Sequence, residues 1–197
     1  MRKFIIAAVL LAVLPTGNMQ ACVSEGPTHN KYMFSVFRRD AMDGPAYLAD
    51  INQYWIDYCK GRIAADDYDR TGYTFYNNHR SEVLKVAQAK GDQAMAAYLK
   101  LLNRYIDVCD LFTVDRWSYP TKEQLATRKQ KALAILNAAK AYRGTQLRQQ
   151  YTLLQMRANM ILGYDLANAN LWNQQVKRFG KSCWREAMQN IYARTLY

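Results

Sequence analysis

The sequence has few of the residues that build metal and catalytic centres. Its 197 residues include only two histidines, His29 and His79, and neither stands in a metal-binding spacing such as His-Glu-x-x-His. It has no glycine-rich phosphate loop, no Gly-x-Ser-x-Gly elbow and no Cys-x-x-Cys pair. Glu82 and Glu186 are single carboxylates without the partner that a glycosidase pair needs. These absences predict a non-enzymatic protein without cofactor or metal.

Long hydrophobic runs are also scarce, and the clearest one lies at the N-terminus. Two basic residues precede the apolar run from Phe4 to Leu14, and Ala21 comes directly before Cys22. This order is typical of a secretory signal peptide, and the run is too short for a permanent membrane anchor. We expect residues 1–21 to be a signal peptide. The protein is then exported to the periplasm, the outer-membrane surface or the extracellular space.

Cysteine is limited to four residues, Cys22, Cys59, Cys109 and Cys183. An exported chain can join them in two disulfides, or Cys22 can carry a lipid and leave an odd thiol. The residues before Cys22 fit neither the lipoprotein signal nor the general signal peptidase site well, so both alternatives stay open. If the helices ending at Cys59 and Cys109 run parallel, these two thiols form the preferred disulfide. Cys22 and Cys183 are then left for a second disulfide, or Cys22 for lipidation.

Positive charge is in excess, with 27 Lys and Arg against 16 Asp and Glu and a formal net charge of +11. The basic residues stand in small scattered groups, on the polar side of predicted helices or in turns. That distribution is typical of a solvated surface. Together with export, it argues against a nucleic-acid partner.

Most of the chain after residue 45 has the apolar spacing of α-helices. The strongest pattern runs from Thr145 to Leu162, where two apolar rows predict a helix buried between neighbours. Gly163 is placed to end that helix. The residues predicted to begin or cap the other helices are Pro45, Asn78, Asp92, Thr121, Asp165 and Ser182.

Part of the strongest helix recurs along the chain. Three apolar positions reappear after thirty-four residues, the period of tetratricopeptide helix pairs. They are Leu154, Ala158 and Leu162, followed by Met188, Tyr192 and Leu196. We therefore predict an all-α fold of antiparallel helical hairpins, stacked as a tetratricopeptide-like (TPR-like) α-solenoid over residues 45–197. Because Tyr197 has no capping signal after it, we expect the repeat domain to continue beyond this chain.

Residues 22–44 lack helical spacing. The alternation from Tyr32 to Phe37 predicts an extended lead-in segment along the first helices. This part, Pro27–Phe37, and two later stretches, Trp117–Glu123 and Leu153–Met160, resemble a family of large exported helical proteins of Bacteroidota. The family has no assigned activity. The resemblance implies a helical-repeat architecture and a longer parent protein, and it implies no mechanism.

One acidic segment has partial calcium-loop spacing. Its residues Asp67, Asp69, Thr71 and Gly72 match the first, third, fifth and sixth positions of such a loop. Asn78 stands where the closing glutamate belongs, so an ordinary acidic turn is the preferred interpretation.

Arg157 and the aromatic residues are the remaining candidates for binding. Arg157 lies inside the most apolar helix, where we expect it to pair with Asp165 or with helix-end carbonyls. The fifteen tyrosines and four tryptophans would suit carbohydrate stacking if they were exposed. Most of them fall on the apolar stripes of the helices, which favours core packing.

The predicted function is therefore that of an exported helical scaffold that binds a protein or peptide partner. Two alternatives remain open at this stage. The first alternative is a glycan-binding surface protein. The second is a helical support for an enzymatic region that follows Tyr197.

Overall fold

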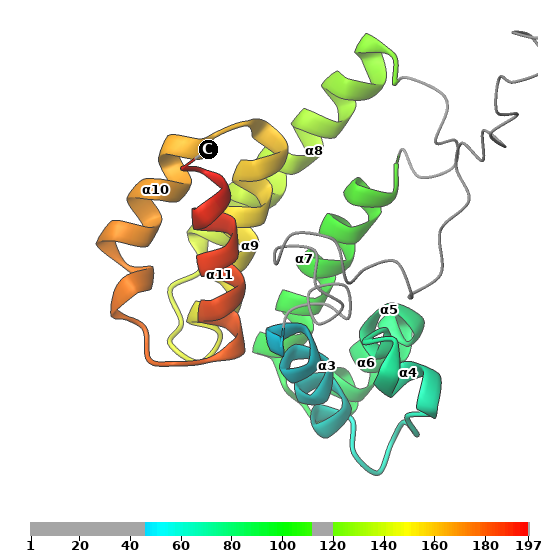
Figure 1. Ribbon diagram of the computed structural model, residues 1–197. Coiled ribbons are helices and arrows are strands. Elements are labelled where there is room, and N and C mark those ends of the chain that lie inside the picture. Colours follow the sequence, from blue (N-terminus) through cyan, green and yellow to red (C-terminus); the bar gives the residue numbers. More distant parts are fainter. Residues whose placement is uncertain (1–45, 112–119, 197) are drawn as a thin grey trace, which may run out of the picture. The chain divides into compact units, whose positions relative to one another are not determined.

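The computed structural model describes residues 46–111 and 120–196 (Figure 1). Within these two ranges the chain forms helices and turns and no strand, which confirms the all-α prediction. None of the helices in this part of the chain is both long and apolar enough to span a membrane. The expected signal peptide (1–21), the lead-in segment (22–44), Cys22, Trp117 and Tyr197 lie outside the described residues.

The described helices alternate with short turns. In chain order they are α3 (Ala46–Tyr58), α4 (Asp67–Thr71), α5 (Phe75–Asn78), α6 (Arg80–Ala89), α7 (Gln93–Asp110), α8 (Lys122–Ala141), α9 (Arg148–Leu162), α10 (Asp165–Gln174), the short 3₁₀ helix η3 (Val176–Arg178) and α11 (Cys183–Arg194).

Several predicted helix caps are confirmed. Asp92 accepts a hydrogen bond from the backbone N–H of Met95 over 3.0 Å, and Ser182 accepts one from Arg185 over 3.1 Å. Thr121 forms the predicted capping box at the start of α8. Gly163 ends α9 in the left-handed conformation, with φ of 73°.

Other helix starts differ from the prediction. Tyr164 occupies the N-cap position of α10 without a capping hydrogen bond from its side chain, and Asp165 is the first helical residue. His79, one residue after Asn78, stands at the junction that begins α6. The acidic segment before Asn78 forms two short helices, α4 and α5, where a turn was the preferred interpretation.

The most strongly predicted helix, α9, is buried on more than one side. It packs against α8, with which it forms an antiparallel hairpin, and against α7, α10 and α11 (Figure 1). Its buried residues are Gln150, Tyr151, Thr152, Leu153, Leu154, Met156, Ala158 and Asn159. Two-sided burial of this segment is confirmed.

The first and last helices of the described part, α3 and α11, also contact each other. Trp184 of α11 packs edge-on against Tyr54 and Trp55 of α3, with ring centroids 5.2 and 6.2 Å apart. A regular solenoid brings together only helices that are neighbours in the chain. The TPR-like stacking is therefore not confirmed, although the hairpins α6–α7 and α8–α9 are present.

The described cysteines, Cys59, Cys109 and Cys183, are free thiols. The predicted disulfide between Cys59 and Cys109 is not formed in this structure, because the two residues lie near opposite ends of α7. Tyr58, at the end of α3, donates a hydrogen bond to Asp92 at the start of α7 over 3.2 Å.

Cys59 thus lies beside the beginning of α7, and Cys109 lies in its last turn. That helix separates the two by about 25 Å at 1.5 Å per residue, whereas a disulfide needs Cα atoms within about 7 Å. Lipidation of Cys22, or its pairing with Cys183, stays a prediction.

Candidate functional site

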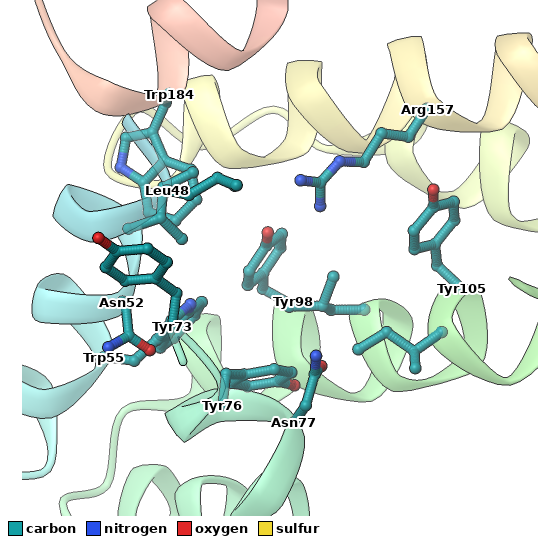
Figure 2. Close-up of a pocket in the computed structure, with 13 residues that line it drawn as sticks. Leu48, Asn52, Trp55, Tyr73, Tyr76, Asn77, Tyr98, Tyr105, Arg157 and Trp184 are labelled. Atoms are coloured by element: carbon teal, nitrogen blue, oxygen red, sulfur yellow. The ribbon is translucent and has the colours of Figure 1, made fainter. Parts of the chain in front are cut away.

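A cavity of about 350 Å³ lies where α3, α5, α7, α9 and α11 converge, and we call it the aromatic pocket (Figure 2). Six of its thirteen lining residues are tyrosine or tryptophan. The lining consists of Leu48, Ile51, Asn52, Trp55, Tyr73, Tyr76, Asn77, Tyr98, Leu102, Tyr105, Ile106, Arg157 and Trp184.

Helical spacing explains why these side chains meet. Four lining residues of α3 are spaced by three or four positions and so share one face of that helix. They are Leu48, Ile51, Asn52 and Trp55. On α7 the residues Tyr98, Leu102, Tyr105 and Ile106 follow the same rule. Two facing helices therefore supply eight of the thirteen lining residues.

Asn52 fastens α3 to the turn between α4 and α5. Its side-chain N–H donates to the backbone oxygen of Asp69 over 3.0 Å, and its side-chain oxygen accepts from the N–H of Phe75 over 3.1 Å. Asn52 is buried, so both bonds are shielded from water. This clamp holds Tyr73 and Tyr76 at the pocket.

Tyr73 stands at the rim in a strained backbone conformation. Its φ is 53°, and among the described residues it is the only non-glycine residue with positive φ. A non-glycine residue in this region costs on the order of 1 kcal/mol or more and persists where the surroundings enforce it. Its side chain is 39% exposed, so the ring borders the pocket without being enclosed.

The walls of the pocket are packed aromatic rings. Trp55 lies parallel to Tyr98 at an angle of 10° with centroids 6.5 Å apart, and it contacts Tyr76 at 4.7 Å. Tyr76 is held in turn by a 2.7 Å hydrogen bond from its hydroxyl to Asn103. Trp55, Tyr76 and Tyr98 are buried, so these rings form a fixed apolar wall.

Arg157 supplies the positive charge of the pocket. Its guanidinium group lies 5.9 Å from the centroid of the Tyr105 ring. The predicted ion pair with Asp165 is not formed, and no carboxylate among the described residues pairs with Arg157. The side chain is half-buried on α9 and reaches into the pocket from the side opposite Tyr76 (Figure 2).

Tyr98 contributes the second polar group. The residue is only 1% exposed, and its hydroxyl forms no hydrogen bond with the described residues. Burial raises the pKa of Tyr98, although the charge of Arg157 opposes the shift. The phenol therefore stays protonated at neutral pH and is available as a donor.

The chemistry of this lining suits binding. Within the described residues it offers no carboxylate, imidazole or thiol that could act as a general base or nucleophile. It offers an apolar volume, a fixed cation and a hydroxyl donor. Such a combination is typical of sites that hold an apolar group with an attached anion.

A second cavity, of about 330 Å³, is polar and lies between the end of α8 and the start of α9. Two of its three cationic residues, Arg143 and Arg148, already have local contacts. Arg143 donates to the backbone oxygen of Lys140 at the end of α8, and Arg148 lies over the ring of Phe179. These contacts are ordinary stabilisation of a helix end, so this cavity is the weaker candidate.

The calcium-loop alternative does not fit the structure. Helix α4 contains Asp67, Asp69 and Thr71. The carboxylate of Asp69 accepts a hydrogen bond from the side chain of Asn78, and its Oδ2 atom lies 3.0 Å from Nε2 of His79. No group of three or more His, Cys, Asp or Glu residues in the described ranges is arranged to hold a metal ion.

Sequence reasoning did not find the aromatic pocket as a site. It assigned most aromatic residues to the core, which is correct for Trp55, Tyr98 and Trp184. The available signal was Arg157, a charged residue inside an apolar helix. The structure places a cavity in front of Arg157, and the described lining of that cavity contains no acidic side chain.

Comparison with known proteins gives no relative from which a function can be transferred. No protein-family model, no curated protein and no solved structure matches this chain.

Proposed function

We propose that this protein is a non-enzymatic binding protein whose aromatic pocket receives an apolar side chain from a protein or peptide partner. The proposal keeps export to the cell envelope or surface as the setting, which rests on the N-terminal sequence pattern. The helical hairpins α6–α7 and α8–α9 serve as the scaffold, and TPR-like stacking with further helices belongs to the same proposal.

The observation that carries the proposal is the combination, in one cavity, of apolar walls with a cation, Arg157, that has no carboxylate partner in the described part of the chain. Five segments of the chain converge on it, and Trp55 and Tyr98 are held rigid by mutual packing. A pre-formed cavity lowers the entropy lost on binding. Its volume of about 350 Å³ is at the small end of ligand pockets, which suits one or two side chains.

A peptide fits this lining better than a glycan does. Sugar recognition by stacking needs aromatic faces that are open to solvent. Here the rings of Trp55, Tyr98 and Trp184 are buried and pack against other rings. Tyr73 at the rim is the one lining ring with substantial exposure among the described residues, so an open stacking platform is missing there.

Blocking the pocket from its rim tests the proposal. Asn77 lines the pocket, is exposed and forms no hydrogen bond with the described residues, so Asn77→Trp adds bulk without disturbing the core. Leu133→Trp on α8 is the matched control, because Leu133 is exposed and lies outside the pocket. Both variants and the wild-type protein are screened against one random peptide library and one glycan array.

We expect the wild-type protein and the Leu133→Trp variant to enrich the same peptides with an apolar residue in common. Asn77→Trp should lose that enrichment by roughly tenfold or more, while its circular dichroism stays helical. Enrichment that survives in Asn77→Trp contradicts the proposal. Binding to glycans alone favours the alternative of a glycan-binding surface protein.

A further inference from the structure

Two hydrogen-bond donors converge inside the aromatic pocket, and neither has a protein acceptor among the described residues. They are the guanidinium group of Arg157 and the hydroxyl of Tyr98. Figure 2 shows the Tyr98 hydroxyl directed toward the guanidinium end of Arg157, across the cavity from Tyr76 and Asn77. The two groups come from different helices, α7 and α9, so their meeting is a property of the tertiary structure.

Neither donor is explained by packing alone. Tyr98 is only 1% exposed as a residue, but its hydroxyl is not one of the fully buried side-chain atoms without a partner, so it is open to the cavity. Arg157 is half-buried beside the Tyr105 ring and has no carboxylate partner among the described residues. Leaving a partly desolvated cation unpaired is unfavourable, and an anionic ligand would remove that penalty.

We propose that the aromatic pocket captures the free C-terminal carboxylate of a partner polypeptide whose last residue is apolar. Arg157 and Tyr98 bind the carboxylate, and the apolar side chain lies against Trp55 and Leu102. The proposal rests on the proposed function, since it names the ligand class of the same site.

Charge complementarity selects a carboxylate. The guanidinium group presents paired N–H donors that match the two oxygens of a carboxylate, and the Tyr98 phenol adds a third donor. The described lining contains no acidic side chain that would repel this anion. Burying a carboxylate among apolar walls costs desolvation free energy. The Arg157 and Tyr98 donors together offset that cost.

The size of the cavity selects a chain end. In a C-terminal residue the carboxylate and the side chain branch from one Cα atom, so both enter a cavity of about 350 Å³ together. An internal Asp or Glu would need space for two chain segments, one entering and one leaving. In an internal Asp or Glu the carboxylate is also the end of the side chain, so no separate apolar side chain is left to fill the apolar part of the pocket.

Matched peptide libraries test the proposal on the full chain. Each library has randomised internal positions and ends in Leu, Phe, Tyr or Trp, and each is made once as the free acid and once as the C-terminal amide. Affinities are measured by equilibrium dialysis with labelled peptides. The variants are Arg157→Gln and Tyr98→Phe, and Arg104→Gln is the control, because Arg104 is exposed on α7 and lies outside the aromatic pocket.

We expect the free acids to bind roughly tenfold to a hundredfold more tightly than the amides, which is the effect of losing charge-assisted hydrogen bonds. Arg157→Gln should reduce this preference to about twofold, and Tyr98→Phe should reduce it severalfold. Arg104→Gln should leave it unchanged.

Equal binding of acids and amides by the wild-type protein overturns the carboxylate proposal and leaves the pocket as a peptide site. Absence of binding by both libraries overturns this proposal and the proposed function together. A preference for acids that persists in Arg157→Gln shows that the carboxylate lies elsewhere and also overturns the assignment.

Discussion

His79 lies between two carboxylates, with its Nε2 atom 3.0 Å from Oδ2 of Asp69 and its Nδ1 atom 2.6 Å from Oε2 of Glu82. Asp69 is 2% exposed and also accepts a hydrogen bond from Asn78 over 2.7 Å. This cluster joins α4, α5 and α6, which together carry Tyr73 and Tyr76 to the aromatic pocket. Its ionisation therefore affects the part of the molecule that shapes the site.

The pKa values of His79 and Asp69 shift in opposite directions. Burial disfavours the charge on His79, but the hydrogen bonds to Glu82 and Asp69 outweigh it and raise the pKa of His79 above 6.5. Burial likewise opposes ionisation of Asp69, but the hydrogen bonds from Asn78 and His79 outweigh it and lower the pKa of Asp69 below 3.8.

We predict that the protein is most stable in mildly acidic solution. The stabilisation from His79 is fully present below pH 6.5 and is lost as the pH rises through its raised pKa. The stabilisation from Asp69 is present above pH 3.8 and is lost as the pH falls through its lowered pKa. The loss on the alkaline side should be about 1 kcal/mol or less, because the His79 side chain is 25% exposed.

Urea denaturation at several pH values measures this effect. The control is His79→Gln, which keeps a side chain able to form hydrogen bonds but cannot titrate. Its free energy of unfolding should be flatter than that of the wild-type protein between about pH 5 and pH 9. Identical pH profiles for the two proteins would show that His79 is not charged by its carboxylate neighbours.

Leu154 and Leu166 test whether α9 is the centre of the packing. Leu154 of α9 is 1% exposed and Leu166 of α10 is 75% exposed, so the same substitution probes a buried and a solvated position. Leu154→Ala should lower the free energy of unfolding by about 2–5 kcal/mol, because it leaves a cavity. Leu166→Ala should change it by about 0.5 kcal/mol or less. Equal effects in chemical denaturation would contradict the burial of α9.

Substitutions at Gly163 and Gly180 test whether the end of α9 needs a left-handed backbone conformation. A Cβ atom added at either position meets nothing within 4 Å, but only Gly163 has a left-handed φ, of 73°. Gly163→Ala should therefore destabilise the protein by about 1 kcal/mol through backbone strain. Gly180→Ala should be close to neutral in thermal unfolding. A neutral Gly163→Ala would show that α9 does not end in the left-handed conformation.

Much of the fold was predictable because local signals dominate in helices. The apolar rows of α9, the glycine that ends it and the caps at Asp92, Thr121 and Ser182 all depend on residues a few positions apart. The same signals were too weak for α4 and α5, which have only five and four residues. Helices of that length depend on tertiary contacts such as the Asn52 clamp.

Long-range contacts were not predictable from local patterns. The packing of Trp184 against Tyr54 and Trp55 brings together helices about 130 residues apart, and periodicity carries no information about such pairs. The Cys59–Cys109 disulfide is not formed here for the same reason, because local patterns could not show that the end of α3 lies beside the start of α7. The aromatic pocket was missed for the same reason. Local patterns predicted a nearby partner for Arg157, whereas the structure places its side chain in a cavity built from distant segments.

Methyl NMR of the protein with a peptide that ends in a free apolar residue tests the central claim most directly. The methyl groups of Leu48, Ile51, Leu102 and Ile106 line the aromatic pocket, whereas those of Leu133 and Leu166 are exposed elsewhere. Our account predicts saturable shift changes at the four pocket residues and none at the two exposed ones. Changes confined to Leu133 and Leu166, with the pocket methyl groups unaffected, would contradict it.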